Sequence, residues 1–131
     1  MRRLAVIALL GLAALQVATQ VGCVTPSIPI PPPDPAKMDF HLTVVGTTST
    51  ATFTYPPDDH FLGGIAYLYN RATGLGIIQK VNPNGSVGPT EPIDAQLGDQ
   101  VVFSVENDAQ TVSTCVVLRE GAQDPTSYCT Q

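Results

Sequence analysis

Apolar and polar residues alternate with a period of two just after the proline-rich part of the chain, and this alternation is the strongest constraint on the fold. Between residues 40 and 44, apolar residues alternate with His and Thr. Between residues 50 and 55 the alternation returns, with Thr at every second position. Period two predicts half-buried antiparallel strands, separated here by the turn residues 46–49. The predicted apolar face consists of Phe40, Leu42, Val44, Ala51, Phe53 and Tyr55.

Further strands are predicted in the middle of the chain. Residues 65–71 alternate, with Ile65, Tyr67 and Tyr69 on one face. Residues 77–81 can pair back across the turn at Thr73-Gly74 as a hairpin. Residues 87–95 contain two prolines, which cannot donate to a ladder, so only an edge or irregular strand is expected there.

The last third of the chain completes the pattern. Val101, Phe103 and Val105 give one clean apolar face. Residues 111–119 are largely apolar on both faces, which favours a central strand covered on both sides. No stretch after the N-terminal segment shows sustained helical periodicity. About seven short strands over residues 37–131 predict an all-β, antiparallel β-sandwich, with a small β-barrel as the alternative.

Turn residues in the C-terminal half carry a resemblance to a known family. An Asn84-Gly85-Ser86 turn, a Gly98-Asp99 pair before a strand and an Asn107-Asp108 turn after it resemble the last strands of bacterial immunoglobulin-like domains of surface proteins. The match covers less than a third of the chain. The Trp and the inter-sheet Cys pair of antibody domains are missing. The resemblance therefore implies the immunoglobulin-like sandwich and not an antibody domain proper.

The N-terminus has the features of an export segment. Arg2 and Arg3 precede an apolar run from Leu4 to Leu15, which is too short to span a bilayer and suits a signal peptide. The end of the segment, Gln20-Val21-Gly22-Cys23, resembles a bacterial lipoprotein signal, although Gln20 stands where such signals usually have an aliphatic residue. The resemblance implies that Cys23 is the lipidated first residue of the mature protein, with an outer-membrane location favoured by Val24. The alternative is ordinary cleavage that leaves a periplasmic or secreted protein.

The cysteine count fits this interpretation. The chain has three cysteines, and exported compartments are oxidising, so an odd number requires an explanation. Lipidation of Cys23 leaves Cys115 and Cys129, 14 positions apart, as a predicted disulfide. A metal site is the alternative, but neither cysteine has a C-x-x-C partner or a neighbouring histidine.

The segment between Cys23 and the first strand is rich in proline. Residues 24–36 contain six prolines, which exclude a helix or a central strand. Such a run is expected to form a polyproline II spacer with a reach of roughly 40 Å. The predicted organisation is a signal peptide over 1–22, a linker over 23–36 and a sandwich domain over 37–131.

The charge balance excludes one class of partner. The full chain has a net charge of −5, and removal of residues 1–22, which include Arg2 and Arg3 but no acidic residue, leaves −7. An acidic surface of this kind is repelled by phosphate, so no nucleic-acid partner is expected.

Few side chains suggest a binding site. Asp58, Asp59 and His60 form a polar cluster that either binds a cation, acts as an acid–base pair or belongs to a solvated loop. Phe61 and Leu62 follow and are either an exposed contact for a partner or part of the core. Residues 58–62 are therefore the possible binding loop. A second acidic group, Asp94, Asp99 and Asp108, could lie at one end of the sandwich and bind calcium, although it lacks the regular spacing of a calcium loop.

The sequence predicts binding or display rather than catalysis. A nucleophile elbow and a phosphate loop are both missing, and we expect neither an enzyme nor a cofactor. The expected function is that of a cell-envelope lipoprotein whose sandwich binds an unidentified envelope protein or has a structural role. The alternatives are a small secreted enzyme inhibitor and a calcium- or carbohydrate-binding module.

Overall fold

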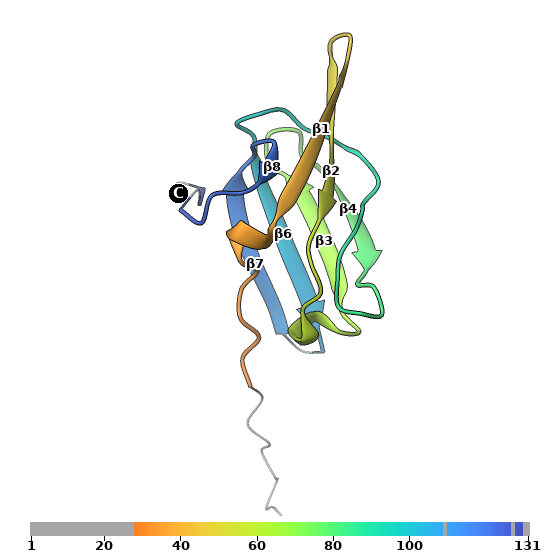
Figure 1. Cartoon of the computed structure of the whole chain (residues 1–131), viewed down its shortest axis with the longest axis vertical. Coiled ribbons are helices and arrows are strands. Elements are labelled where there is room, and N and C mark those ends of the chain that lie inside the picture. Colours follow the sequence, from red (N-terminus) through yellow and green to blue (C-terminus); the bar gives the residue numbers. More distant parts are fainter. Residues whose placement is uncertain (1–27, 109, 127, 130–131) are drawn as a thin grey trace, which may run out of the picture.

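The computed structural model describes residues 28–108, 110–126, 128 and 129, and this part of the chain is built from short strands (Figure 1). Cys23 and the predicted signal peptide lie outside the described residues. No helix among the described residues is long and apolar enough to cross a membrane. The elements are η1 (Pro35–Lys37), β1 (Asp39–Val45), β2 (Thr48–Thr54), η2 (Asp59–Phe61), β3 (Ile65–Asn70), β4 (Leu75–Lys80), β5 (Ile93–Asp94), β6 (Gln100–Asn107), β7 (Gln110–Val117) and β8 (Gly121–Ala122), where η marks a short 3-10 turn.

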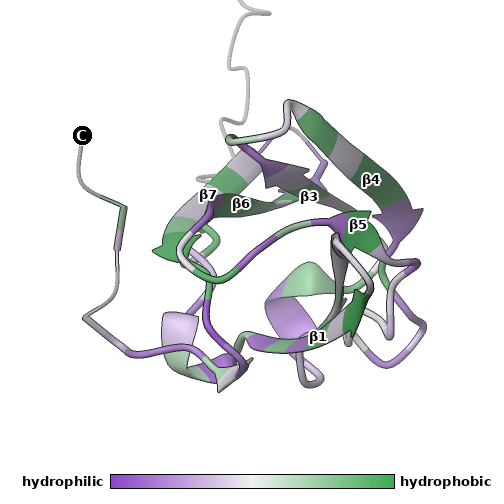
Figure 2. Cartoon of the chain, turned by 90° about the horizontal axis from the view of Figure 1, so that it is seen from above, coloured by the Kyte–Doolittle hydropathy of each residue, from purple (hydrophilic) through white to green (hydrophobic). Residues whose placement is uncertain are grey.

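The strands form two antiparallel sheets that face each other, as the view along the sheets shows (Figure 2). One has the order β5-β2-β1-β8 and the other β4-β3-β6-β7. The predicted β-sandwich is confirmed, and the described strands do not close into the alternative barrel. The orders β5-β2-β1 and β4-β3-β6-β7 correspond to E-B-A and C′-C-F-G of immunoglobulin-like sandwiches.

The core between the sheets is centred on a cluster of aromatic rings. The ring centroids of Phe53 and Phe103 are 4.6 Å apart, and those of Phe40 and Phe53 are 4.9 Å apart. The ring centroid of Tyr55 lies 5.4 Å from those of both Phe61 and Phe103. These tilted contacts join β1, β2, η2 and β6 into one cluster, since each ring is buried.

The alternation placed most strand faces correctly. Val101, Phe103 and Val105 of β6 are all buried. On β3 the predicted face of Ile65, Tyr67 and Tyr69 is the outer one, while Ala66, Leu68 and Asn70 point inward. Residues 87–95 form only the two-residue edge strand β5, as their prolines predicted.

The prediction of a central strand over residues 111–119 was wrong, because β7 is at the edge of its sheet. Thr114, Val116 and Leu118 face the core. The second apolar row is present because the C-terminal tail covers it: Cys129 bonds to Cys115, and Tyr128 forms a bridge with Val116. A covering tail produces the same two-sided apolar pattern as a covering sheet.

Candidate functional site

The molecule has two distinct ends along its long axis (Figure 1). The described chain begins at Ile28 at one end, which it shares with η2 and the β6–β7 turn; we call this the proximal pole. The tip of the β1–β2 hairpin projects at the opposite end, the distal pole, beside the β3–β4 turn. The predicted binding loop, residues 58–62, therefore lies on the side from which the N-terminal segment approaches.

This loop is fixed by hydrogen bonds. Asp58 precedes η2, and its Oδ1 accepts bonds from the His60 backbone N at 3.1 Å and the His60 ring Nδ1 at 2.8 Å. Lys37 Nζ lies 3.7 Å from Asp58 Oδ2. The Asn107 amide donates to the carbonyls of His60 and Leu62. Asp58 and His60 therefore serve to hold the loop in place.

The two apolar residues of the loop have different positions. Phe61 is buried in the aromatic cluster. It is therefore part of the core, which was one of the two predicted alternatives, and not an exposed contact. Leu62 is partly exposed beside Asp59, which is exposed. The loop thus presents one apolar side chain to solvent at the proximal pole.

The carboxyl group of Asp58 has a lowered pKa. Partial burial, the largest influence, raises this pKa. Hydrogen bonds from the ring and backbone of His60, together with the charges of His60 and Lys37, outweigh burial and hold the pKa below its ordinary value of 3.8.

Acidification should therefore reduce the contribution of Asp58 to stability. A carboxyl group whose pKa is lower in the folded than in the unfolded chain stabilises the fold. Its contribution to the free energy of unfolding is complete above the pKa of the unfolded state, and it is lost as the pH falls through the pKa of the folded state. We expect the wild-type chain to be more stable than Asp58→Asn at neutral pH and the two to converge below pH 3.8. Urea unfolding at a series of pH values measures the difference in the free energy of unfolding between the two proteins. The other carboxyl groups contribute equally to both and cancel in this difference. A difference that does not change with pH would contradict the assignment.

The described part of the proline-rich segment, residues 28–36, lies along β7. The Gln110 side chain accepts from the Ile30 backbone N at 2.9 Å and donates to the Ile28 carbonyl at 3.1 Å. Thr114 Oγ1 donates to the Pro33 carbonyl at 2.6 Å. Pro33 and Pro35 are buried. Most of the predicted spacer is therefore part of the domain surface, where it covers the edge of β7.

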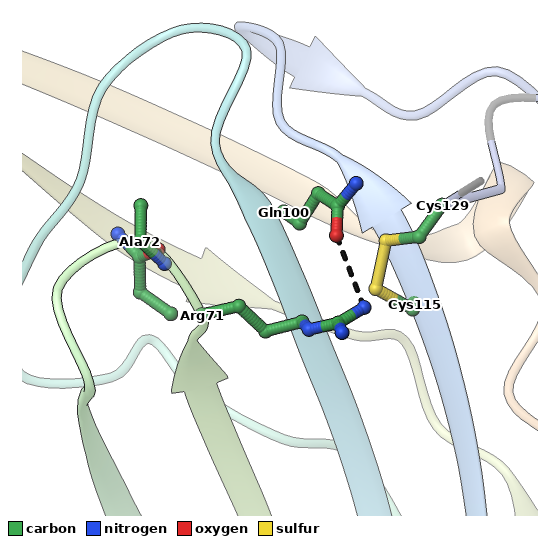
Figure 3. The surroundings of a disulfide bond; sticks show 6 residues. Arg71, Ala72, Gln100, Cys115 and Cys129 are labelled. Carbon is green, nitrogen blue, oxygen red and sulfur yellow. Dashed lines mark hydrogen bonds between the residues drawn. A yellow bond between two sulfur atoms is a disulfide. The ribbon is translucent and has the colours of Figure 1, made fainter. Parts of the chain in front are cut away.

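The predicted disulfide between Cys115 and Cys129 is confirmed. It joins β7 to the C-terminal tail, and the Cα atoms are 5.4 Å apart. The Cys129 backbone N donates to the Cys115 carbonyl at 3.1 Å. Beside it, Arg71 reaches across β6 to Gln100 and points toward the disulfide (Figure 3). The pair anchors the tail that covers β7.

At the distal pole, the β1–β2 hairpin extends past the facing sheet (Figure 1). Its two-residue loop begins at Gly46, whose φ of 62° favours glycine and suits a tight hairpin turn. Val44 and Val45 are 68% and 73% exposed, although Val44 continues the core-facing row of β1. A groove beside them is lined by Leu42, Val44, Thr47, Ser49, Gln96, Leu97 and Glu120. Core-type residues are exposed here because the opposite sheet ends first.

The outer face of the β4-β3-β6-β7 sheet is a second exposed surface. Tyr67 faces Ile78 on β4 and Ser104 on β6, and Tyr69 faces Val102. The Tyr67 hydroxyl donates to Glu106 Oε2 at 2.7 Å, which raises the pKa of Tyr67. Ile78 is 70% exposed and Tyr69 is 45% exposed. Tyrosine is enriched in protein interfaces, so this face is a second candidate contact surface.

The acidic residues considered for calcium do not gather. Asp99 Oδ2 accepts hydrogen bonds from the Asn70 amide and the Gln96 backbone N, and the Asp94 carbonyl accepts another from Asn70. Asp108 follows β6 at the proximal pole, away from Asp99 before that strand. Among the described residues, no group of three His, Cys, Asp or Glu side chains could hold a metal ion.

Three structurally important side chains were not identified from the sequence. Asn70 is fully buried and fastens the β5–β6 loop, Gln110 holds the proline-rich segment, and Glu120 covers the edge of β1. Only Asn70 left a signal, as a polar residue at an inward position of an alternating strand. Gln110 and Glu120 hydrogen-bond to segments whose positions cannot be predicted from the sequence.

We compared the chain with known proteins to ask whether this arrangement of surfaces belongs to a recognised group. No family model, curated protein or solved structure matches the chain.

Proposed function

We propose that the chain is a lipid-anchored protein of the cell envelope, in the outer membrane, and that its sandwich binds another protein rather than catalysing a reaction. One observation carries the proposal: the N-terminal segment and the exposed apolar hairpin lie at opposite poles. A domain held at the proximal pole through Cys23 presents the hairpin away from the membrane.

The exposed side chains support binding. Leu42, Val44 and Leu97 line the groove at the distal pole, and exposed apolar surface of this kind is characteristic of interaction sites. The described acidic and histidine side chains are engaged mainly in local hydrogen bonds, such as those of Asp58 with His60 and of Glu120 with His41. Such pairs stabilise loops and do not converge on a common substrate position.

The fixed proline-rich segment supports display. Gln110 and Thr114 hold residues 28–33 along β7, so this part of the proline-rich segment has a defined path on the sandwich. The hairpin points away from the end of the sandwich at which the described chain begins (Figure 1).

Labelling with palmitate should depend on Cys23. In a bacterial host, we expect the full-length chain to incorporate palmitate and to co-sediment with outer membranes, because a lipidated cysteine with several acyl chains anchors stably. Cys23→Ser should lose the label and appear in the soluble envelope fraction. Val24→Asp is the matched control, since it should keep the label but move toward the inner membrane. Equal labelling of the wild type and Cys23→Ser would remove the anchor from the proposal.

A further inference from the structure

Among the described residues, no strand lies beside the outer edge of β1 beyond Asp39 and Phe40. Strand β8 pairs with β1 only at Asp39 and Phe40. Beyond this point the Leu42 backbone N donates to Glu120 Oε2 at 2.7 Å rather than to a strand. Backbone groups of a strand point the same way at every second residue, so those of Val44 also point outward. This edge can accept an additional strand.

The other sheet edges carry protective features. Strands β5 and β8 have two residues each, which is too short to recruit a partner strand. The edge of β7 is covered by residues 28–33 and by the bridge from Tyr128. Strand β4 ends in Lys80, and an edge lysine discourages pairing. Glu120 covers the edge of β1 at Leu42, but none of these features covers the described residues of the hairpin beyond it. The hairpin is rich in Thr and Val, which favour strands.

The charge distribution indicates which partner can approach this edge. The chain after residue 22 has a net charge of −7, but the stretch from Phe40 to Pro57 contains no Asp, Glu, Lys or Arg. Two copies repel each other over most of their surfaces, and the hairpin beyond Glu120, which lies at Leu42, is where they can meet with few like charges in contact. An antiparallel strand pair is self-complementary about a two-fold axis, so the same edge fits both copies.

We infer that the partner of the hairpin is a second copy of this chain, joined by antiparallel pairing of the two β1 edges around Val44. This deepens the proposed function by naming the displayed sandwich's partner. About the two-fold axis, each Val44 lies opposite the other, and Thr43 lies opposite Val45. Pairing places Val44 of one copy beside the groove of Leu42 and Leu97 in the other.

The antiparallel arrangement has a direct consequence for anchored copies. Because each hairpin runs along the long axis, the two proximal poles lie at opposite ends of the pair (Figure 1). Two copies anchored as proposed and paired in this way would therefore lie in two facing outer membranes. One hairpin edge is smaller than the ~1,200–2,000 Å² interfaces of stable complexes, so the pairing is reversible and depends on local concentration.

Cross-linking of the full-length chain carrying Cys23→Ser, purified without a lipid, tests the pairing separately from the anchor. Adding Val44→Cys should give a covalent dimer under mild oxidation, since cross-strand Cβ atoms are about 5 Å apart. Ile78→Cys is the matched control, because Ile78 is 70% exposed against 68% for Val44. A cross-link with Ile78→Cys instead would overturn the inference.

Sedimentation velocity of the same chain measures the reversible association. We expect a shift from monomer to dimer with concentration, abolished by Val44→Lys and retained in Ile78→Lys. Urea unfolding verifies that both variants are folded. A monomer at every concentration, with no Val44→Cys cross-link, would also overturn the inference. Loss of palmitate labelling alone would contradict only the proposed anchor.

Discussion

Phe103→Ala is expected to lower the free energy of unfolding by about 3–5 kcal/mol, the usual cost of removing a buried phenylalanine ring. Phe103 is buried in the middle of β6, and its ring lies 4.6 Å from that of Phe53, 5.4 Å from that of Tyr55 and 6.5 Å from that of Phe61. The substitution leaves a cavity where both sheets and η2 meet. The measurement is equilibrium unfolding in urea.

Two variants make this result interpretable. Phe103→Leu keeps part of the volume and should lose less stability, which gives a measurement if Phe103→Ala does not fold. Ile78→Ala changes an exposed side chain of the same sheet and should stay within about 0.5 kcal/mol of the wild type. A loss of less than about 1 kcal/mol in Phe103→Ala would show that the aromatic cluster is not the centre of the core.

Replacing both disulfide cysteines is expected to cost about 3 kcal/mol. The bond between Cys115 and Cys129 spans a sequence separation of 14, and closing a loop of about 15 residues is worth about 3 kcal/mol in the chain-entropy model. The double variant Cys115→Ser/Cys129→Ser leaves no unpaired thiol at these positions. Its unfolding midpoint in urea should match that of the wild type with a reductant. If the reductant leaves the wild-type midpoint unchanged, the disulfide does not stabilise the sandwich.

Alternation and proline positions in the sequence predicted the features of the fold that depend on neighbouring residues alone. The buried face of β6 follows from the alternation of Val101, Phe103 and Val105. Residues 87–95 form only a two-residue strand because they contain two prolines. Periodicity does not reveal what covers a strand. The position of β7 was therefore wrong, since its second apolar row lies under the tail that contains Cys129.

The candidate site was less predictable, because it depends on where one element ends relative to another. The sequence placed Phe61 beside a polar cluster, but only the packing of η2 against β6 determines that its ring is buried. Likewise, Val44 belongs to the inward row of β1 and is exposed only because the facing sheet is shorter. A signal for the hairpin was present in the sequence, as a charge-free run from Phe40 to Pro57.

The path of the chain from Ile28 to Val45 has a mechanical consequence. Residues 28–34 run along β7 from the proximal pole, and β1 continues in the same direction to the hairpin tip (Figure 1). A pull between the two poles therefore acts along one continuous stretch of covalent backbone. Strand β1 is already nearly extended and can lengthen little, so the single turn η1 is the compact part of this stretch. The rest of the sandwich is attached to this segment from the side, and of the aromatic cluster only Phe40 belongs to the backbone that carries the force.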